Sequence, residues 1–372
     1  MKQGWEIKKL KDISVLITDG DWIESRHQSD DGIRLIQTGN IGNGIFKAKD
    51  AKPHYISEET FKELGCTEIF SGDCLVSRLP EPVGRACIIP ELDYRMITAV
   101  DCTIIRFNDF ILPKFFVYYS QSSKYLRDIN NSTTGTTRKR ISRKNLESVT
   151  IPIPSISEQE KIVAELDCLS GIIEKKKQQL KEYDALTQSI FYEMFGNPID
   201  NEKGWEVKMW NEVFETQTGK LNANAMVENG KYPFFTCSKE AYQIDYYAFD
   251  CEALLLAGNN ATANYDVKYY NGKFNAYQRT YVLTLKSKGL YLFYKFSLEN
   301  KLSLLQEQSI GGMTKYLTIG ILSKISFICP PLALQQKFAS KIEAIEKQKE
   351  LIKQSIAETE ILFNSRMDYY FN

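Results

Sequence analysis

Two long segments of the chain carry an apolar residue at alternating steps of four and three positions. The first series runs from Ile162 to Met194 and is apolar at eight of ten positions. The second runs from Phe338 to Tyr370 and is apolar at seven of ten. This spacing places a continuous apolar stripe along one face of a helix. Lysine interrupts the stripes at different steps, at Lys176 in the first and at Lys349 in the second.

The first of these helices has clear start and stop signals. Ser157 with Glu160 three residues later forms the pattern of a capping box, and Gly196-Asn197-Pro198 ends the segment. The second helix has Ala333 where the first has Ser157. From Glu158 to Phe195 the helix would be roughly 57 Å long, too long to bury its stripe in one small domain. We therefore expect the two helices to pair with each other as an antiparallel coiled coil.

Mixed strand and helix signals fill the rest of the chain. Strand-like runs in the first region are Ile33–Ile36, Cys74–Ser77, Ala86–Ile89 and Cys102–Phe107. The second region has strand-like runs at Leu254–Gly258 and Tyr281–Leu285, followed by one predicted helix over Leu290–Leu305. Both regions are predicted to be α+β.

The chain contains an internal repeat. Gly4-Trp5-Glu6-Ile7-Lys8 returns as Gly204-Trp205-Glu206-Val207-Lys208, an offset of 204 − 4 = 200, and residues 135–162 match residues 311–338 at an offset of 311 − 135 = 176. Chance similarity between Lys/Glu-rich helices would not explain the non-helical Gly-Trp-Glu match. Two domains of one fold with different interiors are predicted, at 1–154 and 200–330, with spacer helices at 155–199 and 331–372.

The composition is typical of an ordinary folded protein, and the balance of charge means that any basic surface must be local. The chain has 372 residues, 43% of them hydrophobic, and 47 basic residues balance 47 acidic ones. The stretch from Arg127 to Lys144 is the most basic candidate surface. The eight cysteines lie at least eight residues apart, and we expect them to be reduced and mostly buried. No signal peptide or long apolar span is recognised, which predicts the cytoplasm and no membrane partner.

No pattern for catalysis is found. The run Gly39-Asn40-Ile41-Gly42-Asn43-Gly44 does not match a dinucleotide or phosphate loop, and Asn197-Pro198-Ile199-Asp200 lacks the features of an adenine methyltransferase tetrad. Only two histidines exist, His27 and His54, so a metal site or a histidine-based triad is not expected. Catalytic and metal-binding residues are therefore both predicted to be absent.

Polar and basic loops remain as candidates for contact with nucleic acid. Hydroxyl, amide and guanidinium groups can bind phosphate oxygens, and Asn, Gln and Arg can pair with base edges. The candidates in the first copy are Gln37, Asn40, Arg78, Arg85, Thr136, Thr137, Arg138 and Lys139. Those in the second copy are Asn259, Asn260, Tyr277, Gln278, Arg279, Thr314 and Lys315.

The order of these motifs resembles the DNA-specificity (S) subunit of type I restriction-modification systems. The resemblance rests on the Gly-Trp-Glu opening, the Gly135-Thr136-Thr137-Arg138-Lys139-Arg140-Ile141 loop and the Ile151-Pro152-Ile153-Pro154 segment before Gln159-Glu160-Lys161-Ile162, followed by the whole plan again. The second copy departs from it at Met313-Thr314, where the first has Thr137-Arg138.

The resemblance implies a non-catalytic chain with two target-recognition domains for a bipartite, asymmetric double-stranded DNA site. It implies partnership with two methyltransferase subunits and with restriction subunits. S-adenosylmethionine, ATP and Mg would bind to those partners and not to this chain. A type II-like methyltransferase-nuclease partner and a coiled-coil scaffold that does not bind DNA are the alternatives.

Overall fold

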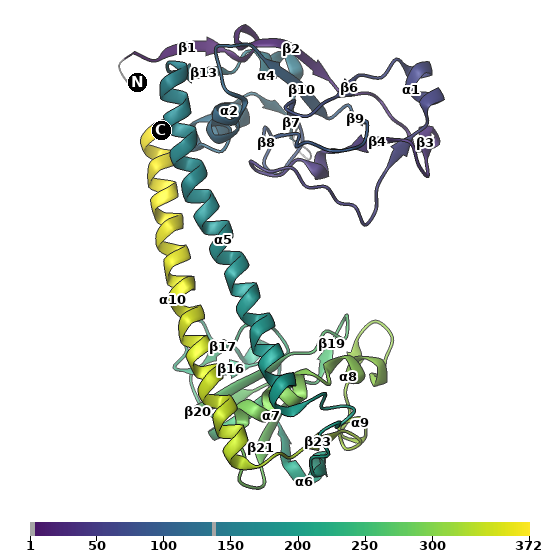
Figure 1. The fold of residues 1–372 in the computed structure, drawn as a ribbon, viewed down its shortest axis with the longest axis vertical. Helices are drawn as coiled ribbons and strands as arrows, with labels where there is room; N and C mark the ends of the chain where they lie inside the picture. Colours follow the sequence, from purple (N-terminus) through teal and green to yellow (C-terminus); the bar gives the residue numbers. More distant parts are fainter. Residues whose placement is uncertain (1–3, 136–138) are drawn as a thin grey trace. The chain divides into compact units, whose positions relative to one another are not determined.

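The computed structural model describes residues 4–135 and 139–372, which form two compact units (Figure 1). Unit 1 comprises Met1–Lys176 and Ser355–Asn372, and unit 2 comprises Lys177–Gln354. Two helices of 40 residues, α5 (Ile156–Phe195) and α10 (Leu332–Phe371), each contribute to both units. The four-segment division predicted from the repeat stays a prediction, since the units are defined by packing and cut both helices.

Unit 1 combines two main sheets with short helices. A four-stranded sheet has the order β2 (Ser14–Asp19), β10 (Cys102–Phe107), β7 (Cys74–Ser77), β8 (Ala86–Ile88). A five-stranded sheet has the order β3 (Gln28–Ser29), β5 (Tyr55–Ile56), β4 (Ile33–Ile36), β9 (Met96–Thr98), β6 (Glu68–Ile69). The pairs β1 (Glu6–Lys9) with β13 (Thr150–Ile153) and β11 (Thr133–Thr134) with β12 (Arg140–Ile141) complete it. The helices are α1 (Glu58–Leu64), α2 (Pro113–Tyr119), α3 (Ser123–Asn131) and α4 (Arg143–Glu147).

Unit 2 is built on one six-stranded sheet. Its order is β15 (Phe214–Thr218), β21 (Thr280–Leu285), β18 (Phe249–Ala257), β20 (Val267–Ala276), β16 (Tyr232–Phe235), β17 (Tyr242–Ile244). The smaller pairs are β14 (Val207–Met209) with β23 (Ser326–Ile328), and β19 (Asn259–Asn260) with β22 (Lys315–Tyr316). The helices are α6 (Trp210–Val213), α7 (Tyr291–Glu299), α8 (Leu302–Gln308) and α9 (Ile319–Leu322).

The predicted strands are confirmed, but the predicted helix over Leu290–Leu305 is wrong in one respect. The structure has two helices there, because α7 ends at Glu299 and α8 begins at Leu302. Lys301 lies between them with a buried side chain whose Nζ donates to the carbonyl of Pro198 at 3.1 Å. The backbone of Lys301 lies outside the helical range, with φ −108° and ψ 2°, so the helix is interrupted there.

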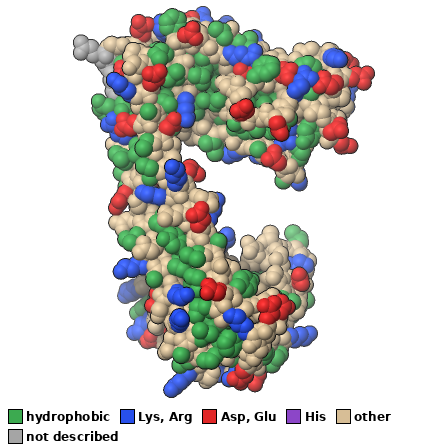
Figure 2. All heavy atoms as spheres, viewed as in Figure 1, with side chains coloured by type: hydrophobic (Ala, Val, Ile, Leu, Met, Phe, Trp, Pro, Cys, Tyr) green, Lys and Arg blue, Asp and Glu red, His purple; other side chains and the backbone are tan. Residues whose placement is uncertain are grey.

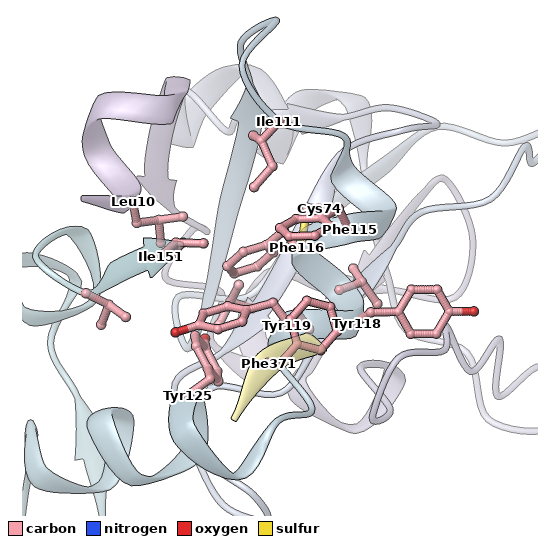
Figure 3. Close-up of a cluster of buried hydrophobic side chains, with 14 of the residues drawn as sticks. Leu10, Cys74, Ile111, Phe115, Phe116, Tyr118, Tyr119, Tyr125, Ile151 and Phe371 are labelled. Atoms are coloured by element: carbon pink, nitrogen blue, oxygen red, sulfur yellow. The ribbon is translucent and has the colours of Figure 1, made fainter. Parts of the chain in front are cut away.

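Aromatic side chains from α10 complete the core of unit 1 (Figure 3). Phe371 packs edge-on against Phe115 and Tyr119, with ring centroids 5.5 and 5.8 Å apart. In unit 2 the corresponding residues come from both long helices: Phe195 of α5 lies 4.8 Å from Phe293 and 5.4 Å from Phe338 of α10. Offset and edge-on rings pack favourably in such cores. Each unit therefore encloses a piece of the helix pair in its own core.

The two apolar stripes are confirmed, since none of their twenty positions is exposed. In unit 1, Lys176 Nζ donates to Ser355 Oγ at 2.5 Å and Glu165 pairs with Arg366. Residue numbers therefore fall along one helix as they rise along the other, and the helices are antiparallel as predicted. In unit 2, Lys349 pairs with Asp184 at 2.8 Å. Both lysines that interrupt the stripes thus find polar partners on the opposite helix.

The predicted N-cap at Ser157 is wrong, because α5 begins two residues earlier. Ser155 Oγ accepts a hydrogen bond from the Glu158 amide at 3.3 Å. The Glu158 carboxylate accepts one from Trp5 Nε1 at 3.2 Å. Trp5 of the repeated Gly-Trp-Glu motif therefore joins the start of the helix to the amino-terminal segment.

A buried glutamine holds the start of each long helix. Gln159 receives a hydrogen bond from the Leu112 amide at 2.8 Å and donates to the carbonyls of Phe110 and Pro154 at 2.9 and 3.0 Å. Its equivalent at the offset of 176, Gln335, receives one from Leu290 and donates to Pro330. Since buried backbone groups need partners, the repeated glutamine has a structural role.

All eight cysteines are free thiols, and Cys66, Cys74, Cys87 and Cys102 are buried. Only half of the eight are buried, so the expectation of mostly buried thiols was too strong. Burial raises the pKa of the Cys102 thiol to about 12. None of the helices in the described part of the chain is long and apolar enough to cross a membrane.

Replacing Gln159 by alanine should lower the free energy of unfolding by about 2–4 kcal/mol, because three partly or fully buried hydrogen bonds to backbone groups would be lost. Gln178→Ala, an exposed position on the same helix, serves as the control and should change it by less than about 0.5 kcal/mol. Urea unfolding followed by circular dichroism measures both. Equal effects of the two substitutions would contradict the structural role of Gln159.

The Glu165 carboxylate should stabilise the helix pair only above the acid range. Hydrogen bonds from Arg366 and then from Tyr370 lower its pKa. Its stabilising contribution is therefore present above the unfolded pKa of about 4.3 and is lost as the pH falls through the lower folded value. The wild type should have a higher melting temperature than Glu165→Gln at pH 7, and the difference should shrink at pH 3. A constant difference would contradict this assignment, and exposed Glu160→Gln is the control.

Candidate nucleic-acid interface

Three backbone segments meet at one end of the four-stranded sheet of unit 1. Arg78 follows β7, and its amide donates to the carbonyl of Asp101 at 2.9 Å. The carbonyl of Arg78 accepts a hydrogen bond from the Ile141 amide at 3.2 Å, which attaches the β11–β12 hairpin. We call Arg78, Asp101 and Arg140 the first corner.

Unit 2 repeats this backbone arrangement. The Gly258 amide donates to the carbonyl of Arg279 at 2.8 Å, and the Gly258 carbonyl accepts from the Leu317 amide at 2.8 Å. Leu317 is the residue that matches Ile141 at the offset of 176. We call Gly258, Arg279 and Tyr316 the second corner. The internal repeat therefore extends from the sequence to the hydrogen bonds that build these two corners.

A glycine allows close backbone approach at each corner. A Cβ added to Gly20 would lie 2.3 Å from the carbonyl oxygen of Thr98, and one added to Gly219 would lie 1.8 Å from that of Ala276. Both glycines directly follow the first strand of their main sheet, β2 and β15. No larger residue fits at these positions without displacing the neighbouring strand. We did not predict this pair from the sequence. Gly20 and Gly219 are 199 residues apart, which differs by one residue from the offset of 200 between the two Gly-Trp-Glu motifs.

The side chains at the two corners differ in chemistry. In the first corner Arg140 forms an ion pair with Asp101 at 2.8 Å. In the second corner the equivalent positions hold Tyr316 and Arg279, and the guanidinium lies 5.4 Å from the centre of the tyrosine ring. A ring face orients a guanidinium without neutralising its charge. The second corner therefore presents an arginine that is not paired with a carboxylate within the corner.

Three predicted contact residues of the first copy have internal roles instead. Arg85 is only 7% exposed and donates four hydrogen bonds to backbone carbonyls, those of Thr38, Ile41, Leu79 and Pro82. Asn40 is 6% exposed; it accepts from the Gln37 amide and donates to the carbonyls of Lys47 and Ala48. This geometry does not support base contact by Arg85 or Asn40, because their polar groups already hold adjacent loops.

Arg78 is also buried, and its guanidinium pairs with Asp19 at 3.1 Å and donates to the carbonyl of Val100. Burial lowers the pKa of Arg78, and the neighbouring Asp19 opposes that shift. Arginine nevertheless stays protonated in proteins. The Arg78 guanidinium is held within the protein by Asp19 and by the carbonyl of Val100, so direct base contact by Arg78 is not supported either.

Gln37 and Lys139 are more accessible. Gln37 lines a hollow of about 440 Å³ with several basic side chains, Arg34, Lys49, Lys52 and His54. Lys139 is exposed and directly precedes β12. Thr136, Thr137 and Arg138 lie outside the described residues. Gln37 and Lys139 therefore remain candidate contacts in unit 1.

The predicted residues of the second copy come together around the second corner. β19 pairs with β22, so that Asn259 lies opposite Tyr316 and Asn260 opposite Lys315. Asn260 Oδ1 accepts hydrogen bonds from the amide and hydroxyl of Thr262 at 2.8 and 2.9 Å, which uses this oxygen for the turn.

The remaining predicted residues of the second copy lie in the turn before β21 and in the hairpin. Tyr277 bridges to Leu221, and exposed Gln278 donates to Asn222 at 2.8 Å. Thr314 is half-buried in the Ile310–Tyr316 hairpin. These positions surround exposed Arg279, which is the only arginine between residues 177 and 354.

Neither unit shows a strong bias of charge on the face drawn in Figure 2. Figure 2 shows Lys and Arg side chains intermixed with Asp and Glu side chains over each unit. Among residues 4–135 and 139–372, no group of three or more His, Cys, Asp or Glu side chains is placed to hold a metal ion. Contacts to a polyanion would therefore depend on a few local cations.

The comparison with known proteins identifies the family. A model of the type I restriction modification DNA specificity domain matches residues 2–182 and 202–360. The specificity subunit of the type I restriction enzyme EcoDI of Escherichia coli is 37% identical over 42% of this chain, but the match spans only 33% of that protein. The MjaIX specificity subunit of Methanocaldococcus jannaschii is 24% identical over 92% of this chain and 87% of its own length.

Solved structures share the fold over the whole chain. The S subunit of a type I restriction-modification system from M. genitalium covers 99% of this chain and 97% of its own, with a TM-score of 0.59 and 13% identity. A chain from a study of type I R-M complex assembly covers 100% of this chain and 98% of its own, with a TM-score of 0.61 and 17% identity. The two segments matched by the family model cover more than half of this chain. The protein therefore belongs to the type I restriction modification DNA specificity family.

Proposed function

We propose that this chain is the sequence-recognition subunit of a type I restriction-modification complex. Each unit reads one half of a bipartite, asymmetric double-stranded DNA target. The chain supplies no catalytic group. Two methyltransferase subunits and the restriction subunits dock on it, and S-adenosylmethionine, ATP and Mg act on those partners.

The observation that carries this proposal is the pair of equivalent corners with different side chains. The same backbone hydrogen bonds hold Arg78 and Gly258, yet the accompanying pairs are Asp101 with Arg140 and Arg279 with Tyr316. Two corners that share their backbone hydrogen bonds but present different side chains are suited to the recognition of two different half-sites. A pure scaffold would not need an exposed, oriented arginine at this position.

Arg279 is the strongest candidate for base contact in unit 2. Its guanidinium is exposed, and Tyr316 restricts its orientation. A guanidinium presents a planar fork of donors that matches O6 and N7 of guanine in the major groove. Lys315 in the adjacent strand is suited to a phosphate oxygen.

Deletion of the gene tests the proposed function directly. Single-molecule mapping of methyladenine in the host genome should show a two-part, asymmetric motif that disappears in the deletion strain and returns on complementation. An unchanged methylation pattern, with expression of the partner methyltransferase confirmed, would contradict the proposal.

Arg279→Ala should weaken binding of the assembled complex to its target by about 10–100-fold, the loss expected for one bidentate base contact. Arg279→Lys should recover little of this affinity, because lysine lacks the planar fork. Removing an exposed charge elsewhere in unit 2, with Lys288→Ala, is the control and should change binding by less than about threefold. Fluorescence anisotropy at fixed salt measures all three, and equal affinities of the wild type and Arg279→Ala would rule out the contact.

A further inference from the structure

The hairpin from Ile310 to Tyr316 carries an almost fully exposed methionine at its tip. Met313 is 96% exposed, the highest value among the large hydrophobic side chains that the structure describes, and Ile310 is 54% exposed. At the offset of 176 the first copy has Thr137 in place of Met313. The apolar tip is therefore a property of the second copy and not of the repeat.

The base of this hairpin is firmly held. The Ile310 amide donates to the Tyr316 carbonyl at 3.1 Å, and the Tyr316 amide donates to the Ile310 carbonyl at 2.8 Å. The Leu317 carbonyl accepts from the hydroxyl of buried Tyr281 at 2.9 Å. Gly311 has a φ of +112°, and a Cβ there would lie 2.3 Å from the Thr314 carbonyl oxygen, so the turn requires glycine. Met313 therefore projects from a fixed support.

Cations lie beside this apolar tip. Lys315 is two residues from Met313 in the same hairpin, and Arg279 lies over the ring of Tyr316 at 5.4 Å. A duplex offers the matching combination, with phosphates at its edge and an apolar stack of bases inside. Methionine and isoleucine are among the side chains that proteins insert between base steps, which unstacks the bases and bends the duplex. The charge beside the tip favours DNA over an apolar protein surface.

We propose that Met313 inserts between stacked bases in the half-site bound by unit 2 and deforms the duplex there. This inference rests on the proposed function, and it adds an element of specificity that depends on how easily a base step opens. Arg279 would contact the edge of a base, whereas Met313 would sense the stacking of the neighbouring step.

Duplexes that carry a fluorescent base test, in the assembled complex, whether Met313 inserts between bases as an apolar wedge. The target motif is first read from the methyladenine map, and 2-aminopurine then replaces the adenines of each half-site and its flanks, one at a time. Unstacking raises 2-aminopurine fluorescence, so binding of the wild type should raise it at one step of a single half-site. Met313→Ala and Met313→Gly should lose the rise, while Met313→Leu should keep it.

A matched control uses Met209, which is 42% exposed on β14, a strand that pairs with β23. Met209→Ala should leave the fluorescence signal unchanged. If the wild-type complex binds the target and no position brightens in a Met313-dependent way, the wedge is refuted while the proposed function stands. If Met313→Ala instead prevents association with the methyltransferase, the tip is a protein contact and the wedge is equally refuted. Failure of the wild-type complex to bind any methylated motif would overturn both proposals.

Discussion

The hydrogen bond from the hairpin to the end of the neighbouring strand is the contact on which both candidate interfaces depend. It joins Ile141 to Arg78 in unit 1 and Leu317 to Gly258 in unit 2, and in both cases only backbone atoms take part. Every residue has a backbone carbonyl, and every residue except proline has a backbone N–H. This contact therefore tolerates changes in side chain. The corner can therefore keep its shape while the residues that it presents vary.

The long helices likewise combine a feature that the two copies share with one that differs between them. Their starts are fixed by Gln159 and Gln335, which satisfy buried backbone groups of the adjoining loops. Along their length each apolar stripe is interrupted by a lysine that finds polar partners on the opposite helix, Ser355 for Lys176 and Asp184 for Lys349. A polar residue in a helix seam favours one register over its neighbours at some cost in stability. Because the two lysines stand at different steps, two separate polar contacts near the middle of the helices favour the same register.

Much of the fold could be predicted from the sequence, and the candidate site only in part. Periodicity predicted both long helices, because burial of an apolar face leaves a regular pattern. Short strand-like runs punctuated by glycine and proline predicted the strands at Cys74–Ser77 and Cys102–Phe107. The predicted base contacts of Asn40 and Arg85 lack support, because sequence does not show whether a polar side chain faces solvent or braces a loop. The equivalence of Asp101–Arg140 with Arg279–Tyr316 was missed, since it depends on hydrogen bonds between segments distant in sequence.

The central claim is that each corner reads its own half of the target independently of the other. Mapping of methyladenine in cells that carry Arg279→Gln in place of the wild-type chain tests it most directly. We expect the base preference to change or relax in one half of the motif while the other half is retained. Changes in both halves, or an unaltered motif with the variant protein folded and assembled, would contradict it.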